Sequence, residues 1–167
     1  MAKKVMLDAG HGGADPGAVS AGFGIREKDL TLAIAQRIGA TLDENYEVEI
    51  LYTRTTDKTM NLSERTALAN REQVDFFISI HINAGGGTGY EDFIYANLSD
   101  TSSTAKLRDV IHQEIAGVLQ KYTVNNRGKK KANFHVLRET KASAVLTENL
   151  FIDSPADQKL LTNTKFL

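Results

Sequence analysis

The chain has 167 residues, 41% of them hydrophobic, with a formal net charge of -1 at pH 7 and no cysteine. This length predicts a single domain that buries its own core without disulfide or metal staples. The balanced charge argues against a protein built around nucleic acid, and the lack of cysteine excludes disulfides, thiolate metal sites and cysteine nucleophiles.

Neither a membrane span nor a secretory signal is visible in the sequence. No apolar run approaches the roughly 20 residues that a membrane helix needs. Residues 1–4 (MAKK) lead straight into a short strand-like run, without the apolar region of a signal peptide. We therefore expect no membrane partner and no signal peptide.

The first third of the chain alternates strand and helix. Residues 3–8 are an apolar run typical of a buried strand. Residues 27–44 repeat leucine or isoleucine at every fourth position from Leu30 to Leu42, which predicts an amphipathic helix. Residues 48–53 again predict a strand.

The middle of the chain continues this alternation. Asn61 followed by Glu64 forms a capping-box pattern, which predicts the start of a second helix. Residues 75–82 predict a strand, the three glycines at 85–87 a loop, and residues 89–96 a further strand.

A third helix is predicted from Ser102 or Ser103 onward. Its expected apolar stripe consists of Leu107, Ile111, Ile115, Val118 and Tyr122. His112 lies off this stripe, so we expect it to be a solvated surface side chain.

The last part predicts two short strands and a helix. The basic residues 127–131 suggest either a solvated loop or a surface that attracts an anionic polymer. Residues 134–137 and 144–147 predict strands, with His135 either near the site or on an exposed face. Pro155 is suited to the first turn of a final helix.

This order of elements predicts an α/β fold. We expect a single domain with a twisted mixed, partly parallel sheet of about six strands and helices on both faces. In such sheets ligands gather at the carboxyl ends of the strands.

Two histidines and two glutamates are candidates to meet at this edge of the sheet. His11 and His81 come at the ends of predicted strands, Glu148 near the end of the last strand, and Glu27 at the start of the first helix. Two His and one Glu form a typical catalytic zinc set with an open position, and a further carboxylate can serve as general base. Each residue alone also has a structural interpretation, such as a turn histidine or a glutamate at a helix N-terminus.

The glycine-rich segment 10–17 invites a second interpretation, as a phosphate-binding loop. Its glycine spacing matches neither a P-loop nor a dinucleotide fingerprint, and no Lys-Ser or Lys-Thr follows. The glycines are also suited to a sharp turn and to an open floor beside His11, on which a bulky polymer can lie.

Four motifs together resemble the catalytic domain of zinc-dependent N-acetylmuramoyl-L-alanine amidases, often called type 3 amidases. They are residues 8–18 (DAGHGGADPGA), Glu27, residues 79–83 (SIHIN) and residues 147–152 (TENLFI), in the family's order. They extend over nearly the whole chain, which makes the combination specific. Segment 127–138 is most similar to the amidases of spore-forming Gram-positive bacteria and their phages.

The resemblance implies a set of roles. His11, Glu27 and His81 are expected to bind one zinc ion (Zn2+), and Glu148 is expected to be the catalytic carboxylate. The implied reaction is hydrolysis of the amide bond between N-acetylmuramic acid and L-alanine in peptidoglycan, causing lysis or remodelling of the cell wall. The expected place of action is therefore the cell wall.

Four further polar residues are candidates for supporting roles. Asp8 and Asp15 are placed to orient a metal-bound imidazole, although residues 15–17 (DPG) also suit a simple turn. Asn83 and Asn133 are candidates to hydrogen-bond the substrate, or else the local backbone.

The resemblance also bears on the extent of the domain. It implies a catalytic domain over residues 1–167, shortened at its C-terminal end and lacking the wall-binding repeats that family members often append. Only about twenty residues separate Asn83 from the third helix, where self-inhibited amidases insert a blocking helix, so we expect an open site. We also expect a monomer.

Two rival functions remain at this stage. One is another zinc hydrolase, such as a carboxypeptidase or amidohydrolase that acts on a different amide. The other is a non-catalytic wall-binding module that keeps the groove and the metal.

Overall fold

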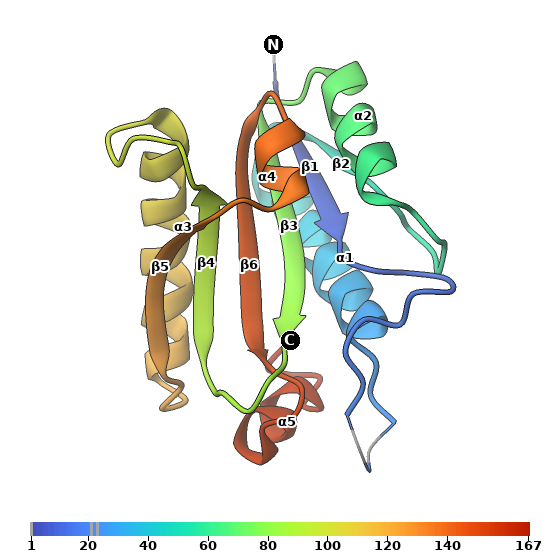
Figure 1. The fold of residues 1–167 in the computed structure, drawn as a ribbon, viewed down its shortest axis with the longest axis vertical. Coiled ribbons are helices and arrows are strands. Elements are labelled where there is room, and N and C mark those ends of the chain that lie inside the picture. Colours follow the sequence, from blue (N-terminus) through green and yellow to red (C-terminus); the bar gives the residue numbers. More distant parts are fainter. Residues whose placement is uncertain (1, 21, 23) are drawn as a thin grey trace.

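The computed structural model describes residues 2–20, 22 and 24–167. Helices and strands alternate along most of these residues (Figure 1). In chain order the elements are β1 (Lys3–Ala9), α1 (Glu27–Asn45), β2 (Val48–Tyr52), α2 (Leu62–Glu72), β3 (Phe76–Asn83), β4 (Tyr90–Tyr95), α3 (Ser103–Gln120), β5 (Asn126–Ala132), α4 (His135–Glu139), β6 (Ser143–Phe151) and α5 (Pro155–Leu161).

The strands form one six-stranded sheet in the order β2-β1-β3-β6-β4-β5. All neighbouring pairs are parallel except β4 and β6, which run antiparallel. The predicted α/β fold with a mixed sheet of about six strands is therefore confirmed. None of the helices in the described residues combines the length and hydropathy needed to cross a membrane.

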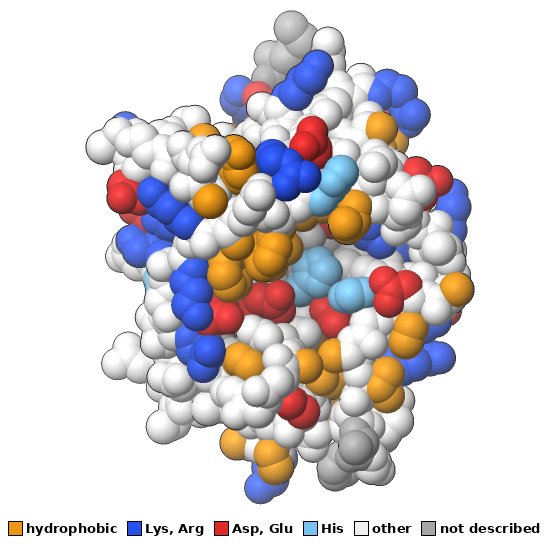
Figure 2. Space-filling model, in the orientation of Figure 1, with side chains coloured by type: hydrophobic (Ala, Val, Ile, Leu, Met, Phe, Trp, Pro, Cys, Tyr) orange, Lys and Arg blue, Asp and Glu red, His pale blue; other side chains and the backbone are white. Residues whose placement is uncertain are grey.

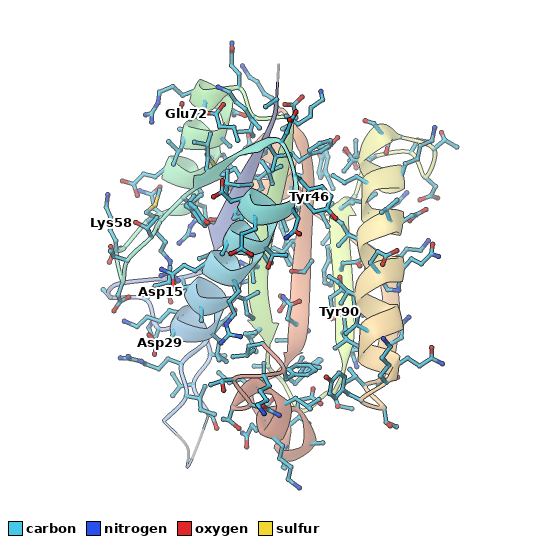
Figure 3. The ribbon with its side chains drawn as sticks, turned by 180° about the vertical axis from the view of Figure 1, so that it is seen from behind. Asp15, Asp29, Tyr46, Lys58, Glu72 and Tyr90 are labelled. Carbon is cyan, nitrogen blue, oxygen red and sulfur yellow. The ribbon has the colours of Figure 1, made fainter. Side chains whose placement is uncertain are left out.

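Helices cover both faces of the sheet. Helices α1 and α3 lie across one face, seen in front of the strands in Figure 3, whereas α2 and α4 lie on the other side (Figure 1). The face of α2 and α4 buries an apolar cluster that includes Met6, Phe77 and Leu146. Because α4 has only five residues, it covers one end of this face and leaves the end near the carboxyl termini of β3 and β6 open.

The predicted helix starts are present at the expected residues. Asn61 accepts a hydrogen bond from the backbone N–H of Glu64, whose side chain in turn accepts from the Asn61 N–H, so α2 begins with a complete capping box. Ser102 accepts from the N–H of Ala105 at the start of α3, and Pro155 occupies the first turn of α5.

Two segments differ from the sequence prediction. Residues 134–137 lie in and beside helix α4 rather than in a strand, because Val136 and Leu137 both pack into the apolar cluster beneath α2. Periodicity alone cannot distinguish a strand from a helix in so short an apolar run. Residues 127–131 lie in β5, the strand at the edge of the sheet, rather than in a loop.

Helix α3 also faces the sheet differently from the prediction. Its buried positions are centred on Ala105, Arg108 and His112, whereas Val118 and Tyr122 of the expected stripe are exposed. His112 is buried rather than solvated, because its Nδ1–H donates to Asp92 Oδ2 at 2.7 Å. The hydroxyl of Tyr90 donates to the same oxygen at 3.0 Å, so this polar cluster lies within the protein on the α3 side of β4.

Candidate metal centre

Three of the residues singled out in the sequence meet at the open end of the sheet. His11 follows β1, Glu27 is the first residue of α1, and His81 lies in β3. One oxygen of Glu27, Oε1, lies 3.1 Å from His11 Nε2 and 3.0 Å from His81 Nδ1. The three potential ligand atoms all lie within 4.8 Å of one another.

Two glycines permit this close approach. A Cβ atom on Gly10 would lie 2.5 Å from the His81 ring, and one on Gly17 would lie 2.6 Å from Glu27 Oε2 and 2.7 Å from the His11 ring. Real Cβ atoms essentially never make such short contacts. These glycines therefore make room for the side chains of the centre, in addition to forming the turn expected from the sequence.

Glu27 is held as a carboxylate by its surroundings. Its Oε1 accepts the backbone N–H of Ile82 at 3.0 Å, and its Oε2 accepts the N–H of Ala18 at 2.9 Å. Burial favours the neutral acid, but hydrogen bonds from His11 and His81 outweigh it and hold the pKa of Glu27 well below its usual range. Burial lowers the pKa of His11, yet the Glu27 carboxylate prevails and raises that pKa to about 8.

These residues fit a zinc ion. Nitrogen and oxygen ligands at about 2.0–2.1 Å in a tetrahedral arrangement lie about 3.3 Å apart, close to the separations found between Glu27 and the two imidazoles. The donor set of two imidazoles and one carboxylate is typical of catalytic zinc. The crowding of both rings on one carboxylate oxygen indicates a site shaped for a cation.

Asp15 contacts the centre and also forms the turn. His11 Nδ1–H donates to Asp15 Oδ2 at 2.8 Å, while Asp15 Oδ1 accepts the N–H of Gly17 at 3.0 Å. Such a bond fixes the tautomer in which Nε2 of the imidazole is free to bind a metal. The two interpretations offered for this residue are thus compatible.

Asp8 lies one layer further from the centre. It is fully buried and accepts hydrogen bonds from Arg65 at 2.7 Å, Ser79 at 2.6 Å and Thr53 at 2.8 Å. In the described structure it has no hydrogen bond to an imidazole. Its connection to the centre runs through Arg65, which donates at 2.7 Å to the backbone carbonyls of Ala9 and His11.

Two buried arginines were not found by sequence reasoning. Arg65, and Arg54 after β2, hold the carbonyls of residues 9–11 and so fix the segment that carries His11. Arg54 also donates to the carbonyl of Lys28 in the first turn of α1, next to Glu27. Nothing in their local sequence distinguishes them from surface arginines of a helix or loop.

Glu148 lies beside the three predicted ligands on the same face of the sheet. It is paired in register with His81 on β3 and directly opposite Glu91 on β4. Its Oε2 is buried and has no hydrogen-bond partner among the described residues. Burial raises the pKa of Glu148 to about 7, the range in which a carboxyl group can both accept and donate a proton.

The two asparagines have local partners. Asn83 donates to Glu91 Oε1 at 2.9 Å and accepts the N–H of Ala84, and Asn133 accepts from Arg138 at 2.7 Å. The Asn83 side chain therefore belongs to the acidic group next to Glu148, whereas Asn133 forms a contact around α4. Neither contact tests a role in substrate binding.

A match to a known family agrees with this geometry. A family model described as N-acetylmuramoyl-L-alanine amidase matches residues 5–167. The chain belongs to this family. The resemblance drawn from the four motifs is confirmed.

Relatives of this amidase family member include proteins from Bacillus and a Bacillus phage. The chain is 46% identical over 165 residues to the sporulation-specific N-acetylmuramoyl-L-alanine amidase of Bacillus subtilis, covering 98% of this chain and 62% of that protein. It is 45% identical over 168 residues to the endolysin of Bacillus phage SPP1, covering 100% of this chain and 61% of that protein. The chain thus spans about three fifths of the length of these relatives.

Solved amidase structures have the same fold. An N-acetylmuramoyl-L-alanine amidase from Clostridium difficile 630 superposes with a TM-score of 0.90 at 31% identity, covering 99% of this chain and 88% of that one. The catalytic domain of CwlV, an amidase from Bacillus (Paenibacillus) polymyxa var. colistinus, gives a TM-score of 0.89 at 31% identity, with 98% and 89% covered.

Two of the predicted ligands of this amidase family member, His11 and His81, line a cavity of about 430 Å³, whereas Glu27 is buried. In Figure 2 histidine and acidic side chains gather in a hollow in the middle of one face, with hydrophobic side chains beside them. The cavity is lined by His11, His81 and Glu148 on one side and by Phe134 and His135, at the start of α4, on the other. Between β3 and α3, residues 84–102 contain strand β4 and loops but no helix, so the blocking helix of the self-inhibited amidases has no counterpart in this described segment.

Proposed function

We propose that this protein is a zinc-dependent N-acetylmuramoyl-L-alanine amidase that cleaves the bond between N-acetylmuramic acid and L-alanine in peptidoglycan. The observation that carries the proposal is the convergence of His11, Glu27 and His81 around one point. Beside them lies the buried carboxyl oxygen of Glu148, which has no hydrogen-bond partner among the residues that the structure describes. The family match supports the substrate.

In this proposal His11, Glu27 and His81 hold one zinc ion. When bound, zinc supplies a Lewis acid that polarises the amide carbonyl and lowers the pKa of a bound water to about 7. Asp15 orients the His11 ring, and the backbone N–H groups of Ala18 and Ile82 orient Glu27.

Glu148 moves the proton. As a carboxylate it takes a proton from the attacking water, and as an acid it gives that proton to the leaving amine of L-alanine. Burial raises the pKa of this carboxyl group above its usual range, which favours both steps near neutral pH. The partly buried position beside His81 keeps this carboxyl group at the reacting bond.

The substrate places the proposed activity at the cell wall. The open cavity accommodates a polymer that enters from solvent, in line with a chain that works as a monomer. No residue from a second copy is needed to complete the set of His11, Glu27, His81 and Glu148.

Digestion of purified peptidoglycan tests the proposal. Mass analysis should find a free lactyl carboxylate on muramic acid and a new L-alanine amino terminus. A chelator should abolish both products and added zinc should restore them. Cleavage only at a bond within the peptide would instead assign a carboxypeptidase.

A matched pair of variants tests the role of Glu148. Glu148→Gln should keep zinc bound and lower the rate by about 10²–10⁴-fold. Glu114→Gln, at an exposed position on α3, makes the same chemical change away from the centre and should keep the wild-type rate. Wild-type turnover by Glu148→Gln would contradict the assignment, and wall binding without turnover in any form would indicate a binding module.

A further inference from the structure

A row of charged side chains extends from the centre across the open face of the sheet. Glu91 on β4 lies directly opposite Glu148 on β6. On the next strand, β5, Arg127 Nε donates to Glu91 Oε2 at 2.7 Å, and Lys130 Nζ donates to the same oxygen. The row ends there, because β5 is the edge strand.

The two cations exceed the negative charge that they face. The other oxygen of Glu91 accepts from the amide of Asn83, so a single carboxylate balances both Arg127 and Lys130. Among the described residues neither cation has another ion-pair partner. Arg127 and Lys130 together therefore carry one more positive charge than Glu91 neutralises.

The cations also retain free hydrogen-bond donors. The Arg127 side chain is 31% exposed and that of Lys130 is 38% exposed. Within the described part of the chain, only Nε of the Arg127 guanidinium makes a hydrogen bond, and the group lies over the Phe151 ring at 4.8 Å. Its outer nitrogens remain available in the forked geometry that suits a carboxylate.

The distance from the centre indicates which part of the substrate lies here. Neighbouring strands are about 4.8 Å apart, so β5 lies about 10 Å from β6. An extended peptide advances about 3.3–3.6 Å per residue, and both cations reach back toward β4 to contact Glu91. A group one or two residues along the stem peptide from the cleaved amide can therefore meet these side chains.

We propose that Arg127 and Lys130 form a specificity site that binds a free carboxylate on the second residue of the stem peptide. The inference rests on the proposed amidase function. The glycan repeat is uncharged where it borders the cleaved bond, whereas the peptide carries carboxylates. A net positive pair at this distance therefore selects the peptide side of the substrate.

Two soluble muropeptides provide the test. Both carry complete stem peptides and differ only at the second residue, which is isoglutamate with a free α-carboxylate in one and isoglutamine in the other. We expect the wild-type protein to prefer the acid by about tenfold in kcat/KM, the effect of one charge-assisted hydrogen bond. This preference should appear mainly as a lower KM for the acid, with a similar kcat for both substrates.

Arg127→Ala and Lys130→Ala should each reduce this preference toward one. Loss of either cation also changes the surroundings of Glu91, but that effect acts on both substrates and cancels in the ratio. Lys129→Ala is the matched control, because this substitution removes the same charge from the same strand. Lys129 differs from Arg127 and Lys130 in that it pairs with Asp109 of α3. It should keep the wild-type ratio.

The outcomes are distinguishable. An equal rate on both substrates, or an unchanged preference in Arg127→Ala and Lys130→Ala, would overturn the inference while leaving the amidase function intact. Failure of the wild-type protein to release L-alanine termini from any substrate, intact peptidoglycan included, would overturn both. A loss of wall binding shared by all three variants, with the acid preference unchanged, would assign the cations to anionic wall polymer and overturn the inference.

Discussion

Replacing Gly10 by alanine isolates the effect of close approach at the metal centre. The added Cβ would lie 2.5 Å from Cε1, 2.7 Å from Nε2 and 2.8 Å from Nδ1 of His81. The backbone of Gly10 is outside the left-handed region, so an alanine is accommodated there and the clash with the ring is the whole perturbation.

The size of the effect follows from these distances. To reach ordinary van der Waals contact the ring must move by about 1 Å. A misplacement of about 1 Å can cost ~100-fold in rate, and a disturbed ligand environment typically costs about 10–100-fold in metal affinity. His81 is partly exposed and can swing outward, so we expect the free energy of unfolding to fall by only about 1–3 kcal/mol.

Zinc affinity, amide release and thermal unfolding should be measured on the same preparations. Gly117→Ala is the control, because Gly117 is exposed on α3 with open space where its Cβ would lie. This substitution should add roughly 1 kcal/mol of helix stability without affecting zinc. Wild-type zinc affinity and activity in Gly10→Ala would show that His81 does not need the gap left by Gly10.

Three further predictions concern the surroundings of the centre. Asp15→Ala should weaken zinc binding about 10–100-fold with little change in the free energy of unfolding, since Asp15 is exposed and acts through His11. Competition with a chelator measures the zinc affinity. An unchanged affinity would mean that Asp15 only forms the turn. Arg65→Ala should lower the free energy of unfolding by about 3–5 kcal/mol in urea titrations, because it leaves the buried Asp8 carboxylate without its ion-pair partner. A loss of under about 1 kcal/mol would be inconsistent with a buried, unpaired carboxylate. In the metal-free protein the folded state keeps the proton of Glu148 up to a pKa of about 7, whereas the unfolded chain releases it near 4.5. Raising the pH through this interval should therefore lower the free energy of unfolding, and Glu148→Gln should remove that part of the slope; an identical pH dependence in both proteins would contradict the raised pKa.

Much of the architecture was predictable because it depends on local signals. The four-residue repeat of α1 and the capping box of α2 are short-range patterns, and both elements formed where they were expected. His11, Glu27 and His81 were grouped from their positions at strand and helix ends together with the family motifs. The structure brings them together, and their role in binding zinc stays a prediction.

The features that the sequence did not predict depend on tertiary contacts. His112 is polar and lies off the apolar stripe, yet it is buried because Asp92 on β4 offers a partner 20 positions away in the chain. Arg65 is similarly committed to Asp8, 57 positions away. The basic segment of β5 looked solvated because the carboxylates that pair with it come from β4 and α3.

The buried pair of Asp8 and Arg65 also couples the candidate metal centre to helix α2. It joins β1 to α2, and its arginine holds the carbonyl of His11. The position of the segment that carries His11 therefore depends on α2 being docked against β1. Local opening of α2 would release that segment and displace a predicted ligand, so the stability of this helix and the integrity of the centre are coupled.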